Sequence, residues 1–376
     1  MRKPHYEQSG DNYKLKDPFK LIALNAASKT VKNIKRFKKY GIEITEIKKS
    51  RGDSAYRILF SSKKPINFQF VHVEESIGTK NLVADELAKI FGKTYYFNIA
   101  IDNVASIVND LTTSGASPLS FMLHIAAYPN EWYLEKKRIK ALLKGTAYAC
   151  NLAGMSWGGG ESGTDRDIIL KNTCLLSGSA TGILLPAETA LDEDKIREKD
   201  VIIGFASNGV HTNGITLLRS ELLKKLPKGY RTKLSDGRTY GEALLDPSVI
   251  YSSLIEELVH TVEVHYAVHI TGHGWRKIMR ARKEFTYIID HLPKYQPIFE
   301  TIQKYANLSD REMYDTYNMG CGFAVFAPQK SIENILKISK RHGIEMQVCG
   351  FVEKGPKVVK LKELGVEFNS SELVIR

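Results

Sequence analysis

One stretch of the chain, residues 98–122 with the sequence NIAIDNVASIVNDLTTSGASPLSFM, constrains fold and function more than any other. Between residues 101 and 111 the apolar side chains recur at helical spacing, which predicts an amphipathic helix. Asp102 and Asn109 lie on its less apolar side, with Asp110 beside them. A solvated helix face of this length normally also carries Lys, Arg or Glu, and this stretch has none. We therefore expect the acids to lie in a binding site; the alternative is Asp102 as a helix cap and Asp110 on an ordinary surface.

The length of 376 residues exceeds the size at which a single core keeps growing, so two domains are expected. Strand and helix patterns alternate in both halves. The expected strands are residues 66–73, 119–127, 175–185, 201–206 and 285–290, and the expected helices are residues 81–91, 131–153, 215–226, 249–259 and 331–342. Because residues 187–199 form a polar linker, we expect domains at residues 1–186 and 187–376 in a mixed α/β (α+β) fold.

The composition, with 43% hydrophobic and 26% charged residues, is typical of a globular protein. No apolar run is long enough to cross a bilayer, and the first residues have no apolar signal core, so we expect a cytoplasmic protein with no membrane partner. Four cysteines are scattered without a CxxC pair, which favours free thiols in a reducing compartment.

The formal net charge is +12, and much of the excess lies in residues 14–51 and 224–233. These tracts contain no helix-turn-helix, zinc-finger or RNA-recognition pattern and no interleaved exposed aromatics. We therefore expect no nucleic-acid partner. We interpret the charge as nonspecific solvation or as attraction of a phosphorylated metabolite.

The sequence EESIGTK at residues 74–80 places Glu74 and Glu75 before a small-residue turn at Gly78 and Thr79, which ends in Lys80. Carboxylates of this kind can hold a magnesium nucleotide, and a lysine ammonium can neutralise phosphate oxygens. Taken alone, the pattern is better explained as an ordinary β-turn with surface charges.

Three successive glycines, Gly158, Gly159 and Gly160, are followed directly by Glu161. Glycine lets a backbone approach a ligand closely, and an acid just after the run can reach a metal. The stretch is neither a P-loop nor a dinucleotide-binding fingerprint. We expect a tight loop here, either functional or purely structural.

The sequence SNGVHTNG at residues 207–214 follows an expected buried strand and precedes an expected helix. Backbone N–H groups at such a junction can bind an anion. His211, between Asn208 and Asn213, can donate to a phosphate or move a proton near neutral pH. A lone histidine is usually structural, but its position after the strand favours the functional interpretation.

His265, His269 and His273 are spaced by four residues, which on a helix would form a metal-binding face. The surrounding sequence VEVHYAVHITG alternates and is rich in β-branched residues, so it favours a strand. We therefore expect no zinc site there.

Seven motifs in a fixed order resemble those of the aminoimidazole ribonucleotide synthetase family, also called phosphoribosylformylglycinamidine cyclo-ligases. They are IGTK (77–80), IDNVASIVNDL with GASPL (101–119), GGES (159–162), SNGVHTNG (207–214), LLDPSVIY (244–251), HITGHG (269–274) and EMYDTYNMGCG (312–322). The resemblance covers about residues 66–330, and YEQSG at residues 6–10 is a further echo upstream.

The resemblance implies a two-domain homodimer whose N-terminal domains pair their sheets, with ATP bound near that interface. It also implies a reaction, the ATP-dependent ring closure of formylglycinamidine ribonucleotide to aminoimidazole ribonucleotide in purine synthesis. Phosphorylation of the amide oxygen gives an iminophosphate that a neighbouring amidine nitrogen displaces. The alternatives are a sister ATP-using enzyme, such as formylglycinamidine ribonucleotide synthase, selenophosphate synthetase, thiamine-phosphate kinase or the hydrogenase-maturation dehydratase, and a non-catalytic paralogue.

Carried over by position, the resemblance assigns Mg2+ to Asp102, Asp110 and Glu161, and catalytic roles to Lys80 and His211. The implied ATP-binding residues are Glu75, Gly78, Thr79, Lys80, Asp102, Asn109, Asp110, Gly159 and Gly160. The residues implied to bind the phosphorylated substrate are Ser207, Asn208, His211, Asn213, Gly214, Asn318 and Gly320.

The chain departs from the family pattern in three respects. Glu75 replaces the usual aspartate, the usual glycine-rich segment is not visible in residues 20–65, and the loop after Ser162 is shortened, with His273 where glycine is common. The longer arm of Glu75 could still ligate a metal.

Overall fold

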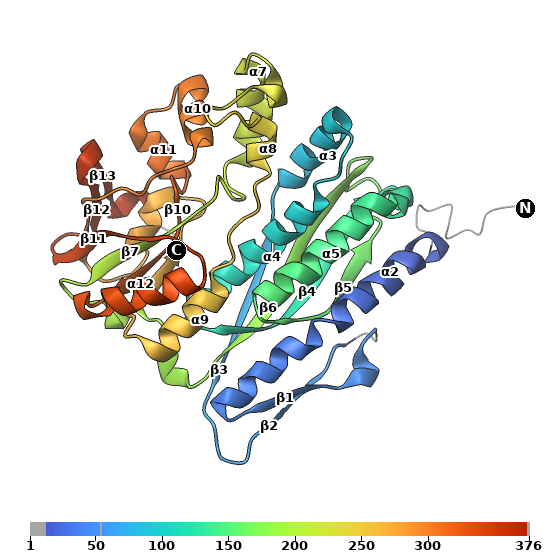
Figure 1. The fold of residues 1–376 in the computed structure, drawn as a ribbon, viewed down its shortest axis with the longest axis horizontal. Helices are drawn as coiled ribbons and strands as arrows, with labels where there is room; N and C mark the ends of the chain where they lie inside the picture. The colour runs from blue at the N-terminus through green and yellow to red at the C-terminus, as the bar shows by residue number, and fades with distance from the viewer. Residues whose placement is uncertain (1–12, 53–54, 374–376) are drawn as a thin grey trace, which may run out of the picture. The chain divides into compact units, whose positions relative to one another are not determined.

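The structure, a computed structural model, describes residues 13–52 and 55–373. The motif YEQSG at residues 6–10, which also resembles the family, lies outside the described residues. The chain divides into two compact units, coloured by residue number in Figure 1. Unit 1 runs to Leu111 and includes Ser117–Ala187, whereas unit 2 comprises Thr112–Ala116 and everything from Glu188 onward. Among the described helices, none combines the length and the apolar character that a bilayer crossing requires.

Unit 1 is built on a four-stranded sheet with the order β3-β6-β4-β5. Strand β6 pairs antiparallel with β3 and β4, whereas β4 and β5 run parallel. The strands are β3 (Gln69–Ser76), β4 (Ser117–Tyr128), β5 (Ser156–Gly163) and β6 (Thr173–Leu184).

Strand β5 corrects the expected tight loop at the glycine run. Its backbone pairs with β4 in register from Ser156 to Gly163. A Cβ on Gly160 would lie 1.8 Å from the carbonyl oxygen of Leu123, so this position needs glycine because two strands approach closely there.

Helices α3 (Lys80–Phe91), α4 (Tyr96–Thr112) and α5 (Lys136–Leu152) lie side by side along the sheet of unit 1 (Figure 1). Helix α4 is the amphipathic helix expected from its 3.6-residue period. Val104, Val108 and Leu111 on its apolar side are fully buried. This helix therefore builds the core of unit 1 and holds its acids in fixed positions.

The first part of unit 1 contains helix α2 (Tyr13–Ser28), the 3₁₀-helix η1 (Val31–Tyr40) and a small antiparallel sheet of β1 (Glu43–Glu46) and β2 (Ile58–Ser61). The first strand expected from the sequence is at residues 66–73, so these two strands are an addition. Their apolar residues join a separate buried cluster, which comprises Ile34, Phe37, Ile42, Ile44, Leu119, Ile183 and Leu185.

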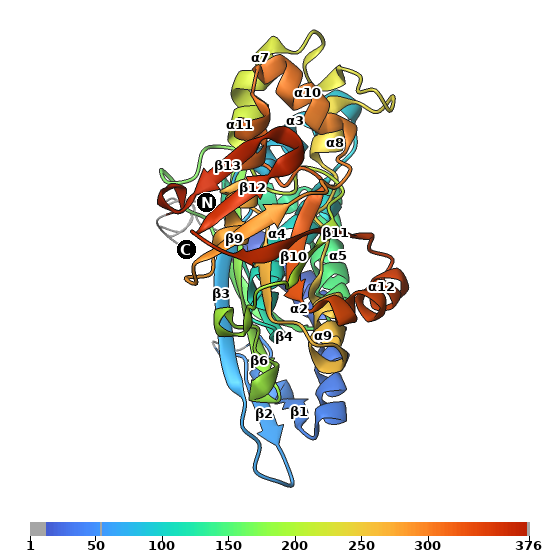
Figure 2. The ribbon, with the colours of Figure 1, turned by 90° about the vertical axis from the view of Figure 1, so that its left-hand side faces the viewer.

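Unit 2 contains a seven-stranded sheet with the order β13-β12-β9-β11-β7-β10-β8. Its neighbouring strands are antiparallel except for β9 and β12 (Figure 2). The strands are β7 (Val201–Ala206), β8 (Tyr266–His269), β9 (Phe285–Ile289), β10 (Cys321–Ala327), β11 (Met346–Lys354), β12 (Val358–Leu361) and β13 (Val366–Asn369).

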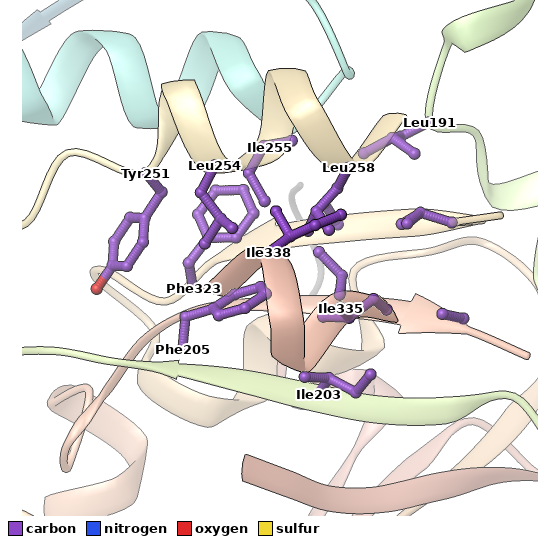
Figure 3. Close-up of a cluster of buried hydrophobic side chains, with 14 of the residues drawn as sticks. Leu191, Ile203, Phe205, Tyr251, Leu254, Ile255, Leu258, Phe323, Ile335 and Ile338 are labelled. Atoms are coloured by element: carbon purple, nitrogen blue, oxygen red, sulfur yellow. The ribbon is translucent and has the colours of Figure 1, made fainter. Parts of the chain in front are cut away.

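Helices α9 (Ser252–Thr261) and α12 (Ile332–Arg341) pack on this sheet and enclose the main core of unit 2 (Figure 3). Leu258 and Ile338 from the helices meet Phe205 of β7 in this core. The other helices are α6 (Ile215–Leu217), α7 (Leu223–Lys225), α8 (Tyr240–Leu244), α10 (Pro297–Ala306) and α11 (Asp310–Thr316), with a π-helical turn η6 (Leu218–Leu222) between α6 and α7. The remaining 3₁₀-helices are η2 (Lys48–Ser50), η3 (Asn130–Leu134), η4 (Ala187–Thr189), η5 (Glu193–Lys195), η7 (Gly229–Arg231), η8 (Gly274–Met279), η9 (Gln329–Ser331), η10 (Lys362–Leu364) and η11 (Ser370–Glu372).

Candidate functional site

Unit 1 contains a cavity of about 650 Å³, lined by helix α2 on one side and by all four strands of the sheet on the other. Cavities of this size suit ligands as large as a nucleotide. Glu74 of β3, His124 of β4 and Glu161 of β5 line it, together with Gly159 and Gly160. Gly159, Gly160 and Glu161 of the expected nucleotide and metal set therefore lie in one cavity.

The strand register explains why these side chains share the cavity. Ser76, Ser177, His124 and Glu161 stand opposite one another across the four strands. Residues opposite one another in register point to the same face of a sheet. His124 Nδ1 lies 2.8 Å from Ser177 Oγ, which fixes the ring, whereas Glu161 is exposed.

The glycine strand β5 is held in place by residues of the first part of the chain. Lys16 Nζ donates to the carbonyl oxygen of Ser162 at 3.3 Å, and Arg51 donates to that of Trp157 at 3.0 Å. The backbone N–H of Trp157 donates to Thr30 Oγ1 at 2.7 Å. These bonds fix a backbone that three glycines would otherwise leave flexible, so Glu161 projects from a rigid strand.

Lys80 and Asp102, which are expected to contact a ligand and a metal, contact each other instead. Lys80 Nζ lies 2.8 Å from Asp102 Oδ2, and both side chains are 0% exposed. Lys80 is the first residue of α3 and Asp102 lies in α4, so the ion pair joins the two helices. In this structure neither side chain reaches a surface that a ligand could contact.

The other expected nucleotide residues are spread over unit 1. Glu75 is exposed on β3, and Gly78 has a left-handed φ of 63° in the turn before α3, next to the half-buried Thr79. Asn109 is fully buried in α4, and Asp110 is half-buried in its last turn. The structure brings none of these into the cavity of β5.

The described part of the chain contains no group of three His, Cys, Asp or Glu side chains that could hold a metal ion. The expected metal ligands Asp102, Asp110 and Glu161 are therefore not assembled into one cluster. Mg2+ is usually held by one or two carboxylates together with substrate phosphates. Glu74 and Glu161 line the same cavity, but they stand on β3 and β5, the first and last strands of the sheet, so each would hold a phosphate-bound Mg2+ by itself.

A second group of expected site residues gathers at one edge of the unit 2 sheet. Strands β7, β10 and β8 are neighbours and run antiparallel. The segment after β7 (207–214), the segment before β10 (318–320) and the turn after β8 (270–274) therefore meet at the same edge. All seven expected substrate residues belong to the first two of these segments.

Asn318 holds the first two segments together. Its Oδ1 accepts from Ser207 Oγ at 2.8 Å and from the backbone N–H of Gly320 at 3.0 Å, and its Nδ2 donates to the carbonyl oxygen of Gly209 at 2.9 Å. Asn318 is 1% exposed. The amide is committed to these bonds, so Asn318 and Ser207 position the site and do not present free groups to a ligand.

Four polar atoms at this edge have no hydrogen-bond partner among the described residues. They are Asn208 Oδ1, Asn213 Nδ2, Gln296 Oε1 and Tyr317 Oη. A buried polar atom without a partner costs about 1 to 3 kcal/mol, so the presence of four in the segments that meet here makes this end of the sheet a candidate site for a polar ligand. Burial also raises the pKa of Tyr317, which keeps its hydroxyl protonated as a donor.

Gln296 and Tyr317 were not expected from the sequence. Tyr317 directly precedes Asn318 within the EMYDTYNMGCG motif, which is the signal that could have identified it. Gln296 lies in no motif, but its Nε2 donates to the carbonyl oxygen of Ser207 at 2.5 Å. Only the folded structure reveals its contribution to the site.

His211 is 2% exposed and adopts a left-handed backbone conformation with φ of 56°. Its ring lies against Gly322, where a Cβ would come within 2.7 Å of His211 Cε1. Gly214 has φ of 67°, and a Cβ there would lie 2.5 Å from the ring of Tyr317. The two glycines therefore make room for the His211 and Tyr317 rings.

The three spaced histidines lie on a strand and its flanks. His265 precedes β8 and its Nδ1 lies 2.7 Å from Asp200 Oδ2, His269 ends β8, and His273 follows in a turn. His273 has a left-handed φ of 76°. Glycine adopts this conformation without strain, which explains why glycine suits this position, and here histidine adopts it.

Two protein-family models match this chain. Residues 74–184 match the AIR synthase related protein, N-terminal domain, and residues 197–362 match the AIR synthase related protein, C-terminal domain. These two matches define an AIR synthase related protein. The phosphoribosylformylglycinamidine cyclo-ligase of Methanococcus maripaludis is 31% identical over 312 residues, which are 82% of this chain and 86% of that protein. The chain belongs to the phosphoribosylformylglycinamidine cyclo-ligase family, which confirms the resemblance and the prediction of an enzyme.

Solved structures show the same fold. The thiamine-monophosphate kinase from Stenotrophomonas maltophilia K279a has a TM-score of 0.58 at 16% identity, covering 83% of this chain and 90% of that one. The hydrogenase maturation protein HypE in complex with ATP has a TM-score of 0.55 at 15% identity, covering 84% and 87%. These likenesses confirm the expected mixed α/β fold.

Proposed function

We propose that the chain catalyses the ATP-dependent ring closure of formylglycinamidine ribonucleotide to aminoimidazole ribonucleotide in purine biosynthesis. The observation that carries this proposal is the match to a cyclo-ligase along 86% of that protein's length. In the proposed reaction the γ-phosphoryl group of ATP moves to the amide oxygen and ADP leaves. An amidine nitrogen then attacks the amide carbon that bears the phosphorylated oxygen. The C–O bond breaks, phosphate leaves and the imidazole ring closes.

We assign nucleotide binding to unit 1 because its cavity has the size and the donors that this ligand needs. Glu161 lines the cavity and would hold Mg2+ together with the phosphates, and Glu74 supplies a second carboxylate on the opposite edge strand. Gly159 and Gly160 let the phosphates approach the backbone of β5. The other residues of the expected nucleotide set lie outside this cavity and stay predictions from the resemblance, and we propose the Lys80–Asp102 pair as a positioning element next to the turn at residues 77–79.

We assign the phosphorylated substrate to the edge of β7, β10 and β8 in unit 2. Asn208, Asn213 and Tyr317 carry the polar atoms without partners that would bind it. His211 lies within the same segment and is proposed to move a proton during ring closure. Ser207, Asn318 and Gly320 hold the two segments together.

The test is a steady-state assay of the purified protein with formylglycinamidine ribonucleotide, ATP and Mg2+, following ADP release and product mass. We expect ADP release that requires the ribonucleotide. ADP release without it, or only with a different phosphate acceptor such as thiamine phosphate, would replace the cyclo-ligase by a sister enzyme. The absence of release with every acceptor would favour a non-catalytic paralogue.

Two variants separate the roles of the two units. Glu161→Gln is expected to raise the KM for ATP or lower kcat at least about tenfold, since it removes one charge at the phosphates. Glu333→Gln, the same change on exposed α12, is its control. Tyr317→Phe is expected to raise the KM for the ribonucleotide and leave that for ATP unchanged, with Tyr305→Phe on α10 as its control. Unchanged kinetics in either site variant would remove that residue from the site.

We further propose that the protein is a cytoplasmic homodimer that pairs the unit 1 sheets. Strand β3 is an edge strand, and Phe70 on it is 52% exposed. An exposed phenylalanine on an edge strand supports such pairing because contact with a second copy would bury it. Light scattering on the pure protein measures the mass. A monomer at concentrations where the enzyme is active would overturn the dimer and leave the cyclo-ligase proposal intact.

A further inference from the structure

The 3₁₀-helix η1 has a sequence that repeats every three residues. Residues 31–40 read VKN, IKR, FKK and Y, so that an apolar residue, a lysine and a third polar residue follow one another. A 3₁₀-helix has three residues per turn, so side chains three apart stand directly above one another. The repeat therefore divides the helix into three straight rows.

Each row of η1 faces a different environment. The apolar row contains Ile34 and Phe37, which are buried in unit 1. In the third row, Asn33 Nδ2 donates to the carbonyl oxygen of Met155 at 2.8 Å, and Arg36 donates to that of Pro118 at 2.7 Å. Two rows are thus fixed to the rest of unit 1, and the remaining row, which consists of lysines, is exposed.

The outward row consists of lysines. Lys32, Lys35 and Lys38 are exposed, and Lys29 continues the spacing of three residues just before the helix. None of these four forms an ion pair with a carboxylate in the described part of the chain. We call them the lysine row. Their charges are therefore available to a partner.

The lysine row lies in the most basic part of the chain. Residues 13–64 contain 15 Lys and Arg and 4 Asp and Glu, which is a net charge of +11 out of the chain's +12. This part also precedes residues 74–184 and 197–362, the stretches that match the two family domains. The charge is thus concentrated in a part of unit 1 that the family domains do not include.

The spacing of the row fits a polyanion with regularly repeated charges. Three residues of a 3₁₀-helix rise about 6 Å, so Lys32, Lys35 and Lys38 span about 12 Å, and Lys29 precedes them in the turn before the helix. Phosphates along one nucleic-acid strand are about 3.4 Å apart along a duplex axis and lie farther apart when the single strand is extended. We propose that the lysine row binds the phosphate backbone of single-stranded nucleic acid, independently of base sequence.

A membrane surface fits the row less well than a nucleic-acid strand does. Helices that lie on membranes insert an exposed apolar face beside their basic residues. The apolar residues of η1 are instead committed to the interior, and the outward face carries only lysine. The absence of a known nucleic-acid-binding motif, which led us to expect no such partner, is compatible with backbone binding because that contact reads no bases.

The experiment measures fluorescence anisotropy of a labelled oligouridylate against the full-length protein at increasing KCl. Contacts to four phosphates of a single strand give a slope of log K against log salt of about −3, or about a 50-fold loss of affinity between 50 and 200 mM. We expect this slope for the natural chain. Replacing the lysine row with glutamine (K29Q, K32Q, K35Q and K38Q together) is expected to weaken binding at least about tenfold and flatten the slope.

The matched control removes four exposed lysines elsewhere, namely K225Q, K228Q, K337Q and K340Q together in unit 2. This control has the same net charge as the variant of the lysine row. Equal losses of oligouridylate affinity in both variants would mean that only overall charge matters and would overturn the proposal. Binding to phosphatidylserine vesicles but not to oligouridylate would also overturn it. Thermal melting and ADP release of both variants show whether they are folded, and these readouts keep the proposal distinct from the proposed enzyme activity.

Discussion

The buried ion pair between Lys80 and Asp102 gives the sharpest stability prediction. Nζ and Oδ2 lie 2.8 Å apart, and neither side chain is exposed. Lys80→Met keeps a long unbranched side chain but leaves the Asp102 carboxylate in the interior without its ammonium partner. Removing one partner of a buried pair costs about 3 to 5 kcal/mol. For unit 1, with about 180 residues, this corresponds to a fall in Tm of about 6 to 20 °C.

Two further variants show whether burial causes the loss. Lys89 pairs with Glu86 at 2.8 Å, but these side chains are 71% and 52% exposed. Lys89→Met is therefore expected to cost less than about 1 kcal/mol. Combining Lys80→Met with Asp102→Leu removes both charges, and it is expected to recover most of the lost stability because no buried charge is left alone.

Calorimetry and circular dichroism measure the melting of each variant, and calorimetric titration with ATP and Mg2+ measures binding. A Lys80→Met protein that melts within about 1 °C of the natural chain would refute the reasoning. If that protein also failed to bind ATP, Lys80 would be a ligand contact and the positioning role would be wrong. A lowered Tm with ATP affinity retained at low temperature supports positioning.

Two other predictions concern unit 1. Burial raises the pKa of Asp85 from 3.8 to about 6. The folded state therefore holds the carboxyl proton more tightly than the unfolded state does. The free energy of unfolding should fall as the pH rises from about 4 to about 6. Asp85→Asn should flatten that fall in a pH series of urea unfolding curves, and an unchanged pH profile would exclude Asp85 as its source. Gly160→Ala places a methyl group 1.8 Å from the carbonyl oxygen of Leu123 and should reduce soluble yield and Tm, whereas at Gly159 the nearest atom is 3.8 Å away and alanine should be tolerated.

Helix α4 could be predicted from sequence because its signal is local. Its apolar residues recur with a period of 3.6, and the helix they form needs no information from distant residues. Strand β5 could not be predicted in this way, because a run of glycines has no period and resembles a loop. Its conformation is decided by β4, which is distant in sequence, and by the close approach at Leu123.

The candidate sites show the same division between local and distant information. The segments that carry His211 and Asn318 could be identified as motifs, but their meeting depends on the antiparallel order of β7, β10 and β8. Likewise, Lys80 and Asp102 each have a plausible role as a separate ligand residue. Their pairing results from the packing of α3 on α4, which no local pattern in the sequence reports.

The lysine row illustrates a third case, in which a local pattern exists but its meaning depends on the type of helix. At 100° per residue, Lys32, Lys35 and Lys38 drift around the axis and their charges spread over a broad face. At 120° per residue the same lysines form a straight line, and the apolar residues between them form another. The sequence contains the three-residue repeat, but only the backbone of the folded structure shows the 3₁₀ geometry, in which Asn33 and Arg36 bond to the carbonyl oxygens of Met155 and Pro118. A spacing that matches phosphates therefore follows from the fold, and the composition alone would describe it only as positive charge.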